Sequence, residues 1–130
     1  MRSVVFASLA AVMAAAAPIL AHHSFAAHYF EEQTVRVPGE LVEFEYRSPH
    51  AWVHVMTQDQ QSGALLKFSA EWASPSRLQQ RGISAETLRP GDRLIITGAP
   101  GRNPAERTIH LKTIERPADG WRWSGQPTRR

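Results

Sequence analysis

Short segments in which apolar and polar side chains alternate recur along the chain from Val35 onward, and this period of two constrains the fold more than any other feature. Between positions 51 and 56, for example, Ala51, Val53 and Val55 share one face. Such alternation is typical of strands with one buried face. The expected strands cover 39–46, 51–56, 64–72, 94–97 and 108–114.

Within the first expected strand, Val42, Phe44 and Tyr46 are predicted to face the core, with Glu43 and Glu45 on the opposite face. In the third, the predicted core face consists of Leu66, Phe68, Ala70 and Trp72. The two glutamates are expected to be solvated surface charges.

One short helix is predicted between the third and fourth strands. Ser74 is a good N-cap, Pro75 suits the first helical position, and Gly82 suits the residue after the C-cap. The resulting order of three strands, a helix and two strands predicts a mainly β protein, a small five-stranded OB-like barrel. An SH3-like barrel or a small sandwich would also bury these strands.

The first 21 residues have the three parts of a signal peptide: a positive start at Arg2, an apolar run over 4–17, and a helix-breaking stretch that begins at Pro18 and ends in the small residue Ala21. Cleavage is expected after Ala21, with Ala26 as the rival position. The apolar run is shorter than the ~20 residues that a membrane-spanning helix needs, so no transmembrane segment is expected. These features predict a periplasmic or secreted protein.

Four regions follow from these patterns: a signal peptide at 1–21, a His-rich arm at 22–34, the barrel at 35–116, and a C-terminal tail at 117–130. The tail carries Trp121 and Trp123 without periodicity. Its tryptophans are expected to cover the barrel, or alternatively to contact a membrane surface or another protein.

Composition excludes several kinds of function. The chain has no cysteine, so disulfides, thiolate metal sites and thiol nucleophiles are absent, and any metal must use N or O ligands. A formal net charge of +3 in 130 residues argues against a dedicated nucleic-acid surface. No hydrolase, kinase or dehydrogenase motif is present, so a non-enzymatic protein is expected.

The histidines are the one concentration of reactive side chains, and His22, His23 and His28 lie near the expected mature terminus. Cleavage after Ala21 would give His22 a free amine beside its imidazole, a chelating pair that suits Cu(II), with Zn(II) as the second choice. His50 is the predicted third ligand, with His54 or His28 as substitutes. The alternative is a solvated arm with no metal.

Two further features bear on this site. His50 and His54 are too far apart along a strand to share a metal without a bend. Glu71, at a strand end, is a candidate for orienting a histidine from outside the metal's own ligands. A separate reading places Trp52, His54 and Trp72 on a surface that docks a partner.

The motifs His22-His23-Ser24-Phe25 and Pro49-His50-Ala51-Trp52 resemble those of an uncharacterised family of small exported bacterial proteins. The resemblance continues through Glu71 and through the segments 74–82 and 88–98. It supports the leader and the barrel, and it implies no activity. A looser similarity to periplasmic OB-fold proteins that bind small ligands or cations rests on element order alone.

The function expected from the sequence is therefore a periplasmic binding protein that coordinates copper or zinc through His22 and His50. The alternative is a metal-free module that binds an envelope protein or a small ligand. A copper oxidase-type enzyme that uses the same terminal histidine is a third hypothesis.

Overall fold

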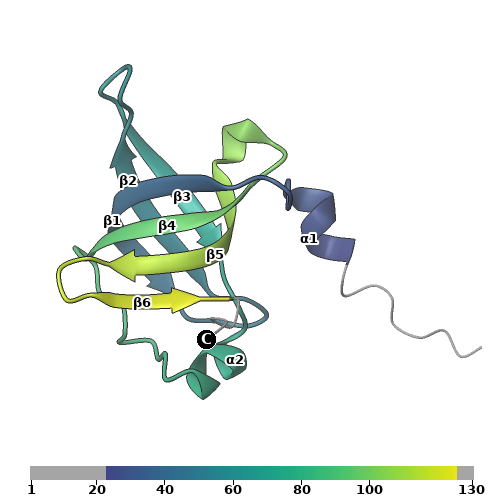
Figure 1. The fold of residues 1–130 in the computed structure, drawn as a ribbon, viewed down its shortest axis with the longest axis vertical. Helices are drawn as coiled ribbons and strands as arrows, with labels where there is room; N and C mark the ends of the chain where they lie inside the picture. Colours follow the sequence, from purple (N-terminus) through teal and green to yellow (C-terminus); the bar gives the residue numbers. More distant parts are fainter. Residues whose placement is uncertain (1–22, 126–130) are drawn as a thin grey trace, which may run out of the picture.

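The computed structural model describes residues 23–125, and Figure 1 shows the strands wrapped into a barrel, with one helix to its right and another below it. The elements, in chain order, are α1 (His23–His28), β1 (Val35–Glu45), β2 (Trp52–Gln58), β3 (Leu65–Glu71), α2 (Pro75–Gln80), β4 (Arg93–Pro100), the 3-10 helix η2 (Pro104–Glu106), β5 (Thr108–Arg116) and β6 (Trp121–Ser124). The predicted order of strands and helix is confirmed.

Strand pairing closes the sheet on itself. The order is β3-β2-β1-β4-β5-β6, and a parallel pairing of β3 with β5 joins Ser69–Glu71 to residues 108–110. The other pairings are antiparallel. This closed five-strand barrel with a helix between β3 and β4 is the expected OB-like fold.

The alternating strands bury one face each, as the pattern predicts. Ala51, Val53 and Val55 of the second segment are fully buried, and Ile96 and Ile114 meet them from β4 and β5. Burial of these branched side chains supplies most of the stability of such a barrel.

One core prediction is wrong. Val42 is 47% exposed, and the core position belongs to Leu41, which is 2% exposed. A bulge in the β1–β2 register between Leu41 and Glu43 is the cause, because an extra residue shifts which side chains face inward.

Helix α2 begins and ends as its sequence predicts. The Ser74 side chain accepts a hydrogen bond from the Arg77 amide, Pro75 takes the first turn, and Gly82 adopts a φ of +75° just beyond the helix. Leu78, 1% exposed, is the buried residue of this helix.

Trp72 also belongs to the core, so its predicted place on a partner-binding surface is corrected. It is 2% exposed and packs against Phe44 and Trp123, with ring centroids 5.9 and 5.2 Å away. As the residue that follows β3, it continues the inward face that the alternation predicts.

Both flanks of the barrel are more structured than expected. The segment 121–124, expected within an aperiodic tail, forms β6, which pairs with the edge of β5 so that Trp123 lies opposite Ile114. In the expected arm, α1 precedes Tyr29, which is 3% exposed and bridges to Gly101. The predicted leader, its first expected cleavage position at Ala21, and His22 all lie outside the described residues. The rival cleavage position, Ala26, lies within α1.

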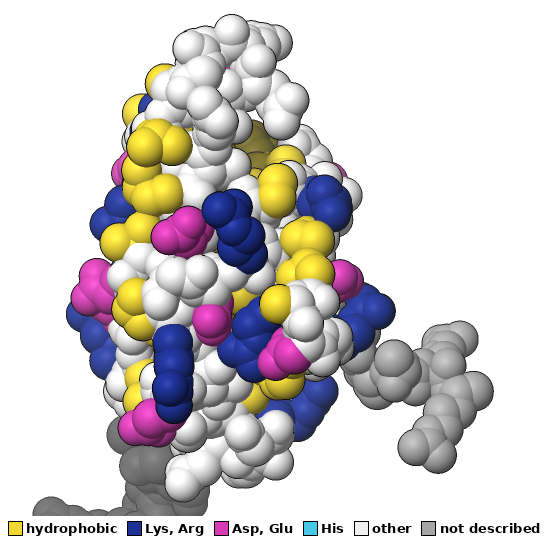
Figure 2. Space-filling model, turned by 90° about the vertical axis from the view of Figure 1, so that its left-hand side faces the viewer, with side chains coloured by type: hydrophobic (Ala, Val, Ile, Leu, Met, Phe, Trp, Pro, Cys, Tyr) yellow, Lys and Arg dark blue, Asp and Glu magenta, His cyan; other side chains and the backbone are white. Residues whose placement is uncertain are grey.

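Basic and acidic side chains are interspersed on the face turned toward the left of Figure 1. Figure 2 shows this face, with Lys and Arg next to Asp and Glu and no histidine in view. This side of the molecule carries no continuous patch of one charge.

Candidate functional site

Glu71, the last residue of β3, holds His50 at the entry to β2. His50 Nδ1 lies 2.7 Å from Glu71 Oε1. Because a carboxylate accepts, Nδ1 donates the proton of this hydrogen bond, and an imidazole whose single proton is on Nδ1 presents the lone pair of Nε2. Among residues 23–125, nothing hydrogen-bonds to that Nε2. This is the contact that the predicted orienting role of Glu71 requires; the metal itself stays a prediction.

The second oxygen of Glu71 is also fixed. Tyr29 donates its hydroxyl to Glu71 Oε2 at 2.6 Å. Burial, and then this hydrogen bond to a carboxylate, raise the pKa of Tyr29 above its ordinary value. The phenol therefore stays protonated and remains a donor, so both carboxylate oxygens of Glu71 have a fixed partner.

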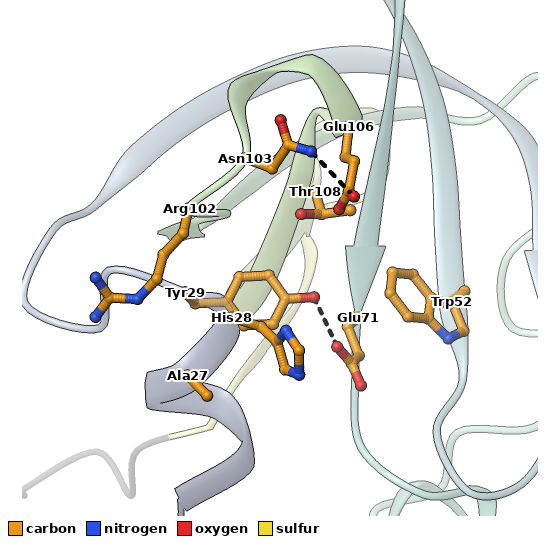
Figure 3. A pocket seen from close by; sticks show the side chains of 9 residues that line it. All are labelled: Ala27, His28, Tyr29, Trp52, Glu71, Arg102, Asn103, Glu106 and Thr108. Atoms are coloured by element: carbon orange, nitrogen blue, oxygen red, sulfur yellow. Dashed lines mark hydrogen bonds between the residues drawn. The ribbon is translucent and has the colours of Figure 1, made fainter.

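A pocket of about 300 Å³ lies beside this hydrogen-bond chain. Figure 3 shows the dashed contact between Tyr29 and Glu71 at its centre, Trp52 across from them, and His28 below. His28 is exposed at the edge of the pocket, at the end of α1.

His110 is a member of the site that the sequence analysis missed. It follows Ile109 in β5 and lies opposite Glu71 in the parallel pairing. Its Nδ1 lies 2.7 Å from Glu31 Oε1, so its ring is held as that of His50 is. The alternation along 108–114 is the one sequence signal for His110, because it puts the polar residues of this strand on the outer face, but it does not identify their neighbours.

Phe25 of α1 links the two imidazoles. Its ring stacks on His110 with centroids 3.9 Å apart and planes at 7°, and it lies 5.4 Å from the ring of His50. His50, Phe25 and His110 also line a groove of about 1010 Å³ that continues toward α2 and Trp123. The first described residues of the chain thus pack on the predicted metal-ligand candidate.

His54 lies apart from His50, and its two nitrogens are both engaged. Nδ1 is 2.8 Å from Ser69 Oγ, and Nε2 is 2.8 Å from Glu45 Oε1. The hydrogen bond from His54 lowers the pKa of Glu45. At 8% exposure, His54 is a buried residue rather than part of an open surface, while half-buried Trp52 stacks over it with centroids 6.4 Å apart.

Glu43 joins this second pair. Within residues 23–125, one group of three ligating side chains comes together, Glu43, Glu45 and His54, with one ligand atom of each within 4.8 Å of the others. The chain therefore carries a His/Glu cluster with the dimensions of a metal site. The sequence pattern predicts both glutamates to be solvated, and it does not indicate that they lie beside His54.

The other histidines predicted as ligands do not join His50 in one cluster within the described residues. His50 and His54 have separate carboxylate partners, Glu71 and Glu45. That these two histidines do not share a metal stays a prediction. His23 begins α1, and its side chain lies outside the described part of the chain, as does all of His22. None of the helices in residues 23–125 has the length and apolar character that crossing a membrane requires.

Comparisons with solved structures find small DNA-binding proteins of low identity. The mitochondrial single-stranded DNA binding protein Rim1 of S. cerevisiae has a TM-score of 0.48 and 13% identity, over 64% of this chain and 91% of that one. A small single-stranded DNA-binding protein from Streptomyces coelicolor has a TM-score of 0.43 and 13% identity, over 65% and 90% of the two chains. What those proteins bind is not transferred to this chain.

No curated protein sequence matches the chain. A family of unknown function, DUF6152, matches residues 9–110, which is more than half of the sequence and includes His50, Glu71 and His110. This agrees with the resemblance to an uncharacterised family, and the protein belongs to the DUF6152 family.

Proposed function

We propose that this protein is an exported, non-enzymatic binding module that coordinates one transition-metal ion, copper before zinc, through His22 at a mature N-terminus and Nε2 of His50. The observation that carries the proposal is the hydrogen bond between His50 Nδ1 and Glu71 Oε1. A carboxylate on one imidazole nitrogen fixes the tautomer and turns the other nitrogen outward, which is the usual support of a metal-binding histidine.

The position of α1 supports the participation of the N-terminus. The Phe25 ring lies 5.4 Å from the ring of His50. Only three positions along the sequence, at most about 10 Å of chain, separate His22 from Phe25, so the proposal needs no long connecting segment between them. Cleavage after Ala21 would supply an amine and an imidazole from one residue, and His50 would add a third nitrogen. Nitrogen-rich sites of this kind favour Cu(II) among the divalent first-row metals.

The ligand set is completed by residues of the same end of the barrel. His23 and His28 are the alternative donors, since both lie in α1. Glu71 acts as the positioning residue for His50, and Tyr29 holds Glu71 in turn. A periplasmic location follows from the proposed leader.

The first test is the mass of the mature protein purified from periplasm, followed by copper titration and electron paramagnetic resonance. We expect an N-terminal His22, one tight Cu(II) per chain, and nitrogen hyperfine structure. His50→Ala should weaken binding by more than about tenfold. A matched control begins one residue earlier, at Ala21, which keeps every histidine but moves the amine away from His22.

Binding that is unchanged both by His50→Ala and by the retained Ala21 would remove the proposal. Cleavage after Ala26 would also remove it, because His22 and His23 would then be absent from the mature chain.

The second candidate is a metal-free module that docks an envelope protein. It is favoured by the groove of about 1010 Å³, which Arg77 helps to line and where the Arg81 guanidinium lies over the Trp123 ring, 5.6 Å from its centroid. Capture of a partner from periplasm that is insensitive to chelator and lost in Trp123→Ala would favour this candidate over the metal site.

A further inference from the structure

The second histidine of β2 lies in a different ligand environment from the first. Glu43, Glu45 and His54 each bring a ligand atom to within 4.8 Å of the other two. We propose that these three side chains form a second cation site, for a divalent ion of the zinc class, independent of the N-terminus and of His50.

The strands build this cluster from neighbouring positions. The bulge after Leu41 places Glu43 opposite His54 across the β1–β2 ladder. Glu45 lies two residues further along β1 and so on the same face. Bulges commonly turn a side chain toward a site. Ligands that stand on paired strands are held more rigidly than ligands on loops.

His54 is oriented from outside the cluster. Ser69, its partner across the β2–β3 ladder, holds Nδ1 at 2.8 Å. The hydroxyl of Ser69 can accept as well as donate. When an ion binds Nε2, the ring proton is on Nδ1 instead, and Nδ1–H donates a hydrogen bond to Ser69 Oγ. The buried ring therefore keeps a partner at both nitrogens. The Nε2 contact with Glu45 is replaced by a shared ion.

The charges of the cluster match a divalent cation. Two carboxylates and a neutral imidazole carry a charge of −2, and the cation now nearest to them is Arg47, whose Nε lies 2.5 Å from Glu45 Oε2. The Arg47 side chain is 64% exposed, so this ion pair is exchanged at small cost.

The donor types select the class of ion. One imidazole and two carboxylates give three protein ligands and leave a fourth position for water, a common arrangement for Zn(II). Ca(II) and Mg(II) prefer oxygen ligands alone and a larger number of them, so the imidazole disfavours both. The site therefore accepts a borderline ion rather than a hard one.

The test needs a signal that belongs to His54 alone. Long-range proton–nitrogen NMR of the imidazole rings, recorded while Zn(II) is added to the full mature chain, reports each histidine separately. We expect the Nε2 signal of His54 to change with a stoichiometry of one ion, and Glu43→Gln to weaken that response by more than about tenfold. Glu40→Gln, on the same strand but outside the cluster, is the control and should leave it unchanged.

Each outcome decides one of the two sites. A His54 signal that stays constant through excess Zn(II), or a response that Glu43→Gln leaves intact, overturns the second site. Glu43 is exposed, so its substitution leaves the fold intact and the result stays interpretable. The His50 signal in the same titration judges the N-terminal site separately.

Discussion

Two histidines four residues apart, His50 and His54, each pair with a glutamate, but the pairs differ in what they leave free. The side chain of His50 is 32% exposed and uses one nitrogen, on Glu71. The side chain of His54 is 10% exposed and uses both, on Ser69 and Glu45.

The His50–Glu71 and His54–Glu45 pairs therefore have different consequences for ligand binding and for stability. His50 can take a ligand on Nε2 without losing a protein hydrogen bond. His54 must exchange one, and in the absence of an ion it ties β1, β2 and β3 together. The first pair is therefore preorganised for binding, while the second contributes to the stability of the free barrel.

The largest expected effect is on stability. His54→Ala should lower the free energy of unfolding by about 3 kcal/mol, since it leaves Glu45 and Ser69 without their partner and opens a cavity under Trp52. His50→Ala should cost less than about 1 kcal/mol, because the ring is partly exposed. Urea denaturation in the presence of a chelator compares the two. Equal losses of unfolding free energy in the two variants would show that His54 is no more important for the stability of the free barrel than His50.

Next comes the positioning role of Glu71. Glu71→Gln keeps the shape of the side chain but removes the negative charge beside His50, and we expect Cu(II) affinity to fall by about 10- to 100-fold. Competition with a chelating dye measures it. Glu40→Gln removes an equivalent charge from the exposed face of β1 and should have no effect. If both variants bind copper alike, the carboxylate on His50 has no positioning role.

A smaller effect is expected from Tyr29→Phe, which removes the hydroxyl bond to Glu71 and should cost about 1.5 kcal/mol at neutral pH. The folded state raises the pKa of Tyr29, so it keeps the proton that the unfolded chain loses above about pH 10. The stability contributed by Tyr29 is complete below that pH and declines above it.

The difference between the parent and Tyr29→Phe should therefore narrow as the pH rises past 10. Denaturation curves at neutral and alkaline pH give this difference directly. A gap that widens with pH would mean that the phenol is not held in its neutral form.

Arg47→Gln should have the smallest effect. Its ion pair with Glu45 is largely exposed, and its loss should change the free energy of unfolding by less than about 0.5 kcal/mol. Thermal denaturation without metal is sufficient. A cost near that of His54→Ala would show that Arg47, rather than His54, fixes Glu45.

Local sequence patterns predicted the elements well, because alternation and capping act between neighbours. Residues within a few positions of each other determine the order of elements along the chain, the Ser74 cap and the turn at Gly82. The bulge that exposes Val42 does not, since it depends on the register of two strands. Nor does β6, which forms because the edge of β5 offers unpaired backbone groups.

The site was predictable only in part for the same reason. The sequence suggested Glu71 as a partner for a histidine because it ends a strand. It could not bring His110 to the same place, because that contact depends on a parallel pairing between segments 39 positions apart. The partnership of His54 with Glu45 likewise needs the β1–β2 register.

The β3–β5 pairing that closes the barrel has a dynamic consequence. Three residue pairs form this seam, and its last pair, Glu71 and His110, is held by Tyr29, Phe25 and Glu31 from the N-terminal segment. The N-terminal segment therefore stabilises this seam, and we expect local opening of the barrel at the seam to require the loss of these contacts. Amide exchange at Ser69, whose N–H donates to the Arg107 carbonyl, would then report on these contacts, and a ligand on His50 would slow exchange at an amide that it does not touch.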